Sequence, residues 1–341
     1  MLRVIKYEIL KLVCKKTFLI TLIVGVILNI FIFYQGLNTY QKDYANKNNN
    51  KYSVQMHKKV DDINKWVQFK DAVIRDAKVI KNNGKDTYMN KRITKLSELL
   101  SKVKKPKVIN DYACNDMFNY ICPWFIIGLI LIIALAPIFS DEYSKGTDNI
   151  LMTCKEGKKN LVTSKLITCC IISVIIFVIF AVIDLTLYFS YYNLKMNFNS
   201  IQSVSSFLSS PYNINIFNYL GLMLILKLLG VIAFGILIMY ISSKSQSLIV
   251  TIVSSGLVLY LPFIIPFSEN TPLGLINEFS YQRILNVNDF FNNYKVFNIF
   301  SNPILYFNII LIVFIFLTVA LIFLTYRTYV ERQITVETYE E

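Results

Sequence analysis

Long apolar segments dominate the pattern of hydrophobic and polar residues along this chain. A helix that crosses the roughly 30 Å core of a bilayer needs about 20 mostly apolar residues, and six segments have or approach this length. Strands of a membrane barrel would alternate in polarity over about 10 residues, and these segments do not alternate. The pattern therefore predicts an all-α fold, a six-helix transmembrane bundle. The predicted spans are Thr17–Tyr34, Ile121–Phe139, Leu166–Phe189, Tyr219–Ile241, Leu248–Phe267 and Ile304–Tyr326.

Two further segments show amphipathic helical spacing. Residues 1–16 place apolar side chains on one helical face and basic side chains on the other, which is typical of a helix at a membrane surface. In the large polar segment 38–120, apolar residues recur at helical spacing on both sides of Asn83-Gly84, and we expect two antiparallel helices over residues 54–103. The predicted organisation is an interfacial helix (1–16), span 1 (17–34), a large extracellular loop with a helical hairpin (38–120), and spans 2–6 with a short tail (121–341).

The distribution of Lys and Arg predicts which way the chain is oriented, because short cytoplasmic loops carry an excess of these residues. Basic residues cluster in the N-terminal segment, in the loop after span 2 and in the C-terminal tail, whereas the short loops of the opposite side carry Lys195, Arg283 and Lys295. We therefore expect a multi-pass protein of the cell membrane with both termini in the cytoplasm. The outer loop 38–120 is also basic, but the rule weakens for loops longer than about 60 residues.

The composition excludes several classes of protein. Of the 341 residues, 55% are hydrophobic and 17% are charged, whereas soluble domains carry about 25% charged residues. The net charge of +13 would suggest nucleic-acid binding in a soluble protein. Most of this charge falls in the 38–120 loop, where attraction to anionic lipid or a cell-envelope polymer is the better explanation, and we expect no nucleic-acid partner. The hairpin is either a solvated spacer or a cap that contacts a substrate or partner.

The sequence lacks the usual motifs for catalysis and metal binding. It has no Gly-rich phosphate loop ending in Gly-Lys-Ser/Thr, no HExxH and no CxxC pair, and His57 is its single histidine. We therefore expect no catalytic residue, no metal and no cofactor in this chain. Cys114 and Cys122 both fall on the predicted outer side, where they either form a disulfide or remain free thiols.

Two charged residues lie inside predicted spans, Asp184 in span 3 and Lys227 in span 4. A charge within the bilayer is costly unless it is paired, reaches the interface or faces a cavity. Because consecutive spans are antiparallel, both residues lie toward the outer ends of their spans. They form either an intramembrane ion pair or two side chains that extend separately to the outer interface.

The loop between spans 2 and 3 has a pattern of its own. Glu142 is followed by Gly146-Thr147, by Ile150-Leu151 and by the basic Lys165 just before span 3. Together with the amphipathic start at Lys6–Leu12, the six spans and the large first outer loop, this pattern resembles the permeases of type-2 ATP-binding-cassette exporters. The resemblance extends to the branch that includes bacitracin- and lantibiotic-resistance transporters.

The resemblance implies a role for each of these parts. The loop around Glu142 would be a rigid, exposed coupling helix that docks on a separate ATPase subunit, a homodimer that binds ATP and Mg²⁺. Two copies of the permease, or the chain and a homologous permease, would surround the translocation path, with the first and fifth spans nearest the dimer axis. The resemblance also implies that residues 268–302 form a re-entrant helix pair, whereas their composition alone equally allows a flat interfacial helix.

The expected function is that of the membrane subunit of an ATP-driven exporter for a peptide antibiotic, drug or lipid, with a role in antibiotic resistance. The abundance of Ile, Asn and Lys suggests an AT-rich Gram-positive bacterium. The alternative is an energy-independent membrane receptor, immunity factor or anchor that binds a partner through its basic hairpin. Copurification of an ATPase subunit would distinguish the two.

Overall fold

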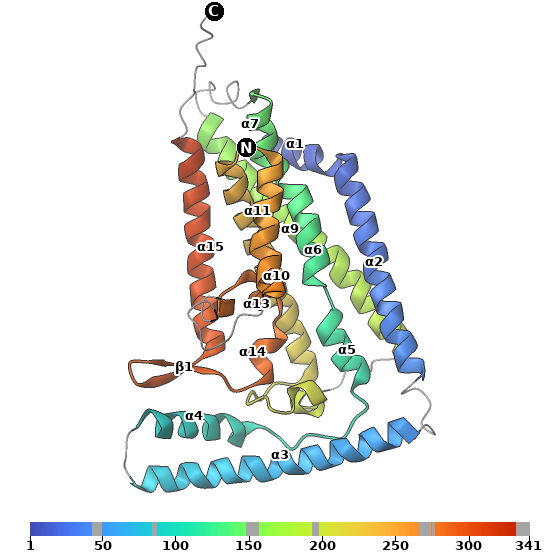
Figure 1. The fold of residues 1–341 in the computed structure, drawn as a ribbon, viewed down its shortest axis with the longest axis vertical. Helices are drawn as coiled ribbons and strands as arrows, with labels where there is room; N and C mark the ends of the chain where they lie inside the picture. The colour runs from blue at the N-terminus through green and yellow to red at the C-terminus, as the bar shows by residue number, and fades with distance from the viewer. Residues whose placement is uncertain are drawn as a thin grey trace, which may run out of the picture.

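The computed structural model describes residues 1–42, 50–83, 87–147, 157–192, 198–265, 274 and 277–331. In these residues, long helices run side by side along an elongated bundle (Figure 1), so the predicted all-α fold is confirmed. Helices α1 (Leu2–Val13) and α7 (Pro137–Ser144) lie at one end, which we call the α1 end. Helices α3 (Asn50–Asn83) and α4 (Tyr88–Lys102) lie across the other, which we call the hairpin end.

Among the described residues, 5 helical segments are long and apolar enough to cross a membrane. They are α2 (Lys16–Tyr40), the segment Tyr112–Ser144, α9 (Gly157–Tyr191), α10 (Ile216–Lys244) and α15 (Tyr306–Val330).

The predicted fifth span is shorter than expected. Helix α11 (Leu248–Ile264) has 17 residues, or about 26 Å of helix at about 1.5 Å per residue. The helix ends there because Ile265 precedes Pro266, and a residue before proline is disfavoured in the helical conformation. Ile265 is accordingly extended, with φ −98° and ψ 112°. The remaining two residues of the predicted span, 266 and 267, lie outside the described residues.

The second predicted span is not a continuous helix. It begins at a break: the segment Tyr112–Ser144, which contains it, is divided into α5 (Tyr112–Tyr120), α6 (Trp124–Leu135) and α7. At the first break, Cys122 has a positive φ of 49° and the following Pro123 has no N–H to continue a helix. Pro137, at the start of α7, causes a second and smaller interruption for the same reason.

Helix α10 lies at the centre of the bundle. It packs against α6, α7, α9, α11, α15 and the short helix α13 (Tyr281–Leu285). Helix α9 approaches it closely at Gly235, where a Cβ atom would lie 2.6 Å from Ser173 Oγ and 3.1 Å from Cys169 Sγ. Small residues permit such close contact between membrane helices, so Gly235 fixes the distance between α9 and α10.

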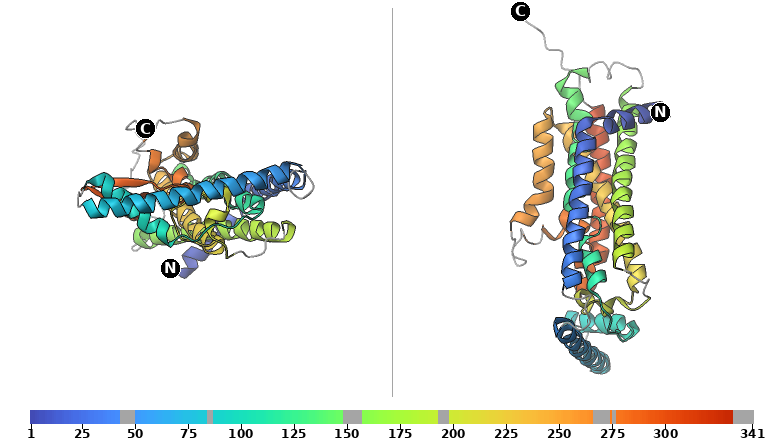
Figure 2. Two further views of the ribbon diagram at one scale, coloured as in Figure 1. Left: turned by 90° about the horizontal axis from the view of Figure 1, so that it is seen from below. Right: turned by 90° about the vertical axis from the view of Figure 1, so that its right-hand side faces the viewer.

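The two helices expected over residues 54–103 are confirmed as α3 and α4, which run antiparallel across the hairpin end (Figures 1 and 2). Trp66, Leu100 and Val103 form a small apolar core between them, and Leu208 packs against it. Leu208 follows the short 3-10 helix η3 (Ser205–Phe207), so the hairpin is joined to the bundle by apolar contact. Its extracellular location stays a prediction.

The chain between α11 and α15 contains short helices and a β-hairpin. Helix α13 contacts α10 and α11, and α14 (Asn288–Asn292) contacts η3. Strand β1 (Val296–Ile299) pairs antiparallel with β2 (Asn302–Leu305), and β2 also contacts α4 of the hairpin. The predicted re-entrant helices fall in this region, and whether α13 and α14 enter the bilayer stays a prediction.

The close packing at Gly235 can be tested by adding a side chain. We expect Gly235→Val to destabilise the protein by about 1–3 kcal/mol, the usual result of overpacking a core. The matched control is Gly221→Val in the same helix, where nothing lies within 4 Å of the added Cβ. Thermal unfolding in one detergent compares the two variants, and equal melting temperatures would contradict the assigned contact between α9 and α10.

Candidate functional site

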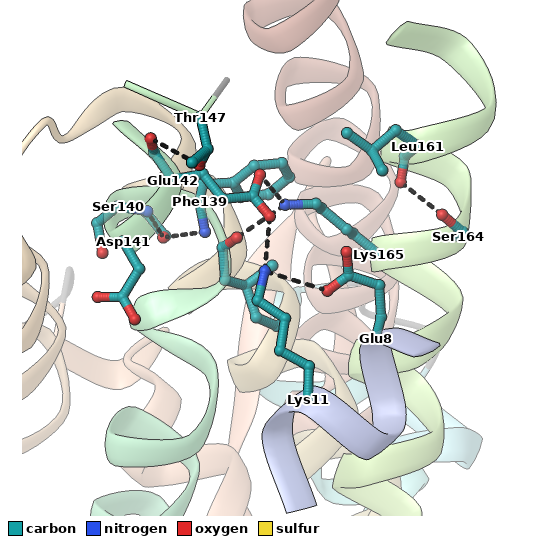
Figure 3. Close-up of polar contacts among 12 residues, drawn as sticks. Glu8, Lys11, Phe139, Ser140, Asp141, Glu142, Thr147, Leu161, Ser164 and Lys165 are labelled. Carbon is teal, nitrogen blue, oxygen red and sulfur yellow. Dashed lines mark hydrogen bonds and ion pairs between the residues drawn. The ribbon is translucent and has the colours of Figure 1, made fainter. Parts of the chain in front are cut away.

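Charged side chains from three helices meet at the α1 end, around Glu142 of α7 (Figure 3). Lys11 Nζ of α1 lies 2.8 Å from Glu142 Oε1, and Lys165 Nζ of α9 lies 2.5 Å from Glu142 Oε2. Glu8 Oε2 adds a longer contact of 3.8 Å to Lys11. We call Glu8, Lys11, Glu142 and Lys165 the Glu142 cluster. It ties α1, α7 and α9 together through both oxygens of one carboxylate.

Three members of the Glu142 cluster, namely Glu8, Glu142 and Lys165, are buried. Glu142 is 4% exposed and Lys165 is 0% exposed. Lys165 Nζ also donates to the carbonyl oxygen of Ile138 at 2.8 Å and lies 4.6 Å from the centre of the Phe139 ring. A buried ammonium group is tolerated when it is both paired and hydrogen-bonded, and Lys165 meets both conditions.

Lys11 is the partly exposed member of the cluster. Burial lowers its pKa, but the hydrogen bond from Lys11 to Glu142 and the negative charges of Glu142 and Glu8 outweigh burial, so the pKa of Lys11 is raised. The ammonium group therefore stays protonated at neutral pH. A second ion pair, between Lys15 Nζ and Asp141 Oδ2 at 2.7 Å, joins the start of α2 to α7 beside it.

The start of α7 is held by α10 through a serine. The backbone N–H groups of Phe139 and Ser140 both donate to Ser242 Oγ at 3.2 Å, and Ser242 Oγ donates to the carbonyl oxygen of Ala136 at 2.6 Å. The first N–H groups of a helix have no intrahelical partners, and Pro137 at the first position of α7 has no N–H of its own. Ser242 satisfies two of them, which fixes α7 on the bundle.

The segment after α7 is exposed. Gly146 has a φ of +63°, the left-handed conformation that favours glycine just after a helix. An added Cβ at Gly146 would have no atom within 4 Å. Thr147 Oγ1 donates to the carbonyl oxygen of Glu142 at 3.3 Å. Ile150 and Leu151, the apolar pair of the predicted coupling loop, lie outside the described residues.

The structure corrects one expectation about this loop. We expected an exposed coupling helix, but Glu142 is buried within the protein itself. The reason is that α1, which packs against α9, supplies Lys11, while α9 supplies Lys165. Glu8 and Lys11 were not among the predicted site residues. The sequence signal for this pair is a spacing of three residues, which places both side chains on one face of a helix. The role of the predicted loop residues in coupling stays a prediction.

Asp184 and Lys227 bind one peptide unit rather than each other. The N–H of Cys122 donates to Asp184 Oδ2 at 2.7 Å, and Lys227 Nζ donates to the carbonyl oxygen of Ile121 at 2.5 Å. These two groups belong to the same peptide bond, at the break between α5 and α6. Asn29 Nδ2 of α2 also donates to Asp184 Oδ1 at 2.5 Å. We call Asn29, Asp184 and Lys227 the peptide clamp.

The peptide clamp is buried, with Asp184 and Lys227 2% and 6% exposed, so neither side chain extends separately to the interface within this fold. A backbone group inside a bilayer must be hydrogen-bonded within the protein. The break after α5 leaves the Ile121–Cys122 peptide without helical partners, and the two charged side chains supply them. The opposite charges compensate one another across this peptide.

The disulfide alternative for Cys114 and Cys122 is wrong in this structure, because both are buried free thiols. They are separated by about two turns of a mostly helical segment, which places their Cα atoms on the order of 10 Å apart at about 1.5 Å per residue. A disulfide requires Cα atoms within about 7 Å. Across the described residues, no group of three or more His, Cys, Asp or Glu side chains is arranged to hold a metal ion.

Comparison with known proteins gives one family. The chain matches the family model described as ABC-2 family transporter protein over residues 2–325, which includes the Glu142 cluster, the peptide clamp and all but the last turn of α15. Comparisons with curated proteins and with solved structures give no match.

The Glu142 cluster predicts an order of stability among variants. We expect Glu142→Gln to destabilise the protein by about 2–5 kcal/mol, because it leaves the buried Lys165 without a counter-charge. Lys11→Gln should have a smaller effect, since Lys11 is partly exposed and Lys165 remains to pair Glu142. Denaturation in detergent measures both, and an equal or reversed order would contradict the assigned burial of the cluster.

The peptide clamp predicts coupling between its two charges. We expect Lys227→Met to lower the melting temperature, because Asp184 then stays buried without its compensating cation. Adding Asp184→Asn should recover part of the loss, since a neutral amide oxygen still accepts from the N–H of Cys122. Lys244→Met, at the exposed end of the same helix, is the control. Additive losses in the double variant would refute the clamp.

Proposed function

The chain belongs to the ABC-2 family of transporter proteins, and we propose that it forms the translocation path of an exporter and couples to an ATPase through α7. It is a membrane permease subunit, and the ATPase activity resides in a separate subunit. The observation that carries this proposal is the Glu142 cluster. Its ion pairs and the Ser242 contacts fix α7 to α1, α9 and α10. A force applied to α7 is therefore passed to several spans at once.

The contact surface for the ATPase would be the exposed end of α7 and the residues after it. Ser144, Lys145, Gly146 and Thr147 are all exposed, whereas the other end of α7 faces the bundle. An exposed surface on a rigidly held helix suits a docking contact, because the partner meets a preformed shape and little order is lost on binding. Glu142 contributes indirectly, by holding α7 in place.

We assign the α1 end to the cytoplasm, where an ATPase subunit would find its ATP. The positive-inside pattern supports this, since α1 and the loop after α7 carry many of the basic residues of short segments. Figure 1 shows α1 and the C-terminal end of α15 at this same end, in agreement with two cytoplasmic termini. The hairpin of α3 and α4 would then lie outside the cell.

The finer assignments rest on the resemblance in sequence. We propose a substrate among peptide antibiotics, drugs or lipids, a place in the bacitracin- and lantibiotic-resistance branch, and a Gram-positive source. The working assembly would pair an ATPase homodimer with two permeases, either two copies of this chain or this chain and a homologous one. Membership of a transporter family favours this function over the receptor or anchor alternative.

Charge reversal at the exposed end of α7 tests the coupling surface. We expect Lys145→Glu to weaken ATPase binding by at least roughly tenfold, which corresponds to about 1.4 kcal/mol, because reversing a charge at an interface places like charges together. The permease should keep its melting temperature, since Lys145 is exposed. Copurification of the ATPase with each variant, together with substrate-stimulated ATP hydrolysis, gives the measurement.

The matched control is Lys81→Glu, an exposed lysine at the end of α3, on the opposite end of the molecule. It changes the net charge by the same amount and should leave ATPase copurification unchanged. If Lys145→Glu and Lys81→Glu both behave like the unsubstituted protein, α7 is not the docking element.

A further inference from the structure

A polar cavity of ≈ 320 Å³ lies at the hairpin end, far from the Glu142 cluster. It is enclosed by the first part of α3, the segment before α5, the start of α5 and η3. In Figure 1 this is the end of α3 that lies below α5. The lining includes Gln55, Met56, Lys58, Asn110, Tyr112 and Asn115.

The cavity wall is held by a buried ion pair. Lys59 Nζ lies 2.7 Å from Asp111 Oδ1 and donates to the carbonyl oxygen of Ile109 at 3.1 Å. The backbone N–H of Ser205 donates to Asp111 Oδ2 at 2.5 Å. Burial lowers the pKa of Lys59, and the charge of Asp111 partly opposes this. These contacts join α3, the segment before α5 and η3 into one wall.

The ion pair also limits what the cavity can bind. Because Lys59 and Asp111 neutralise one another, neither offers a free charge to a ligand. Asp62, the other carboxylate of the lining, has Lys65 Nζ 3.9 Å from its Oδ1. A phosphate or other strong anion is usually met by several converging cationic or N–H donors, and here Lys58 is an exposed single lysine. A lipid chain would need walls that are mostly apolar, whereas polar and apolar atoms share this lining about equally.

The remaining lining can both donate and accept hydrogen bonds. Gln55, Asn110 and Asn115 contribute side-chain amides, each with a carbonyl oxygen and an NH₂ group. The Oδ1 atom of Asn115 is buried and has no hydrogen-bond partner among the described residues, whereas the Oδ1 atom of Asn110 accepts from the backbone N–H of Tyr112 at 3.3 Å. Met56 and the ring of Tyr112 supply apolar surface beside these groups.

From this lining we propose that the cavity binds a neutral, hydroxyl-rich ligand, a saccharide of about two sugar units. Each hydroxyl group both donates and accepts a hydrogen bond, which matches the side-chain amides. The C–H faces of a sugar ring match the apolar surface of Met56 and Tyr112. The volume falls at the lower end of the range of about 300–1,000 Å³ for small-molecule sites.

The position of the cavity gives such a ligand access to the bundle. It would contact α3 of the hairpin and, through Tyr112 and Asn115, the first turns of α5. Helix α5 is the outer piece of the divided second span, whose other end is α7. A saccharide bound here would therefore fix the hairpin to the same span that carries the proposed coupling surface.

Calorimetric titration of the purified full chain in lipid nanodiscs tests the proposal. The probes are maltose and N,N′-diacetylchitobiose, with trialanine as a peptide of similar size. We expect saturable binding of at least one disaccharide and weaker binding of trialanine. Asn115→Leu should weaken disaccharide binding by about fivefold, as expected for the loss of one hydrogen bond. Gln55→Leu provides a second variant should Asn115→Leu fail to fold.

The matched control is Asn64→Leu, which changes an exposed amide of α3 that does not line the cavity and should leave the affinity unchanged. The proposal is overturned if neither disaccharide binds, if trialanine binds more tightly than both, or if Asn115→Leu and Gln55→Leu retain the affinity of the unsubstituted chain. No ATPase is present in the assay, so its result is independent of the proposed exporter function.

Discussion

The second span is divided by prolines, and the backbone groups freed at its breaks must find partners inside the protein. A lipid bilayer offers no water to hydrogen-bond them. The bundle meets this constraint with buried polar side chains from two neighbouring helices. At the Cys122 break these are Asp184 of α9 and Lys227 of α10. At the start of α7, Ser242 of α10 accepts from the freed N–H groups, and Lys165 of α9 binds the carbonyl oxygen of Ile138 within α7. The same two helices therefore support both breaks.

Hydropathy and helical spacing were sufficient to predict five long apolar helices and the two helices of the hairpin, because both signals are local. The breaks were not predicted, since Pro123 and Pro137 interrupt an apolar run that reads as one helix. The end of α11 was missed for a similar reason, although Pro266 was visible in the sequence. In each case a single proline changed the backbone within a segment of uniform hydrophobicity.

The candidate site was predicted only in part, because its geometry depends on contacts between distant segments. Glu142 and Lys165 were both identified, and the structure pairs them at 2.5 Å. The burial of Glu142 depends on α1, whose basic face looked suited to a membrane surface. The partners of Asp184 and Lys227 are backbone groups, which a search for complementary side chains does not find. The cavity under the hairpin requires three separated segments to meet and leaves no sequence motif.

Polar contacts at both breaks determine how this span can transmit a movement. A buried charge that loses its partner is destabilised by several kcal/mol. The peptide clamp and the Glu142 cluster therefore resist local bending of the second span relative to α9 and α10. A displacement of α7 is more easily accommodated by moving α5–α7, α9 and α10 together. Under the proposed coupling, such a movement would reach α5 and the cavity beneath the hairpin at the opposite end of the molecule.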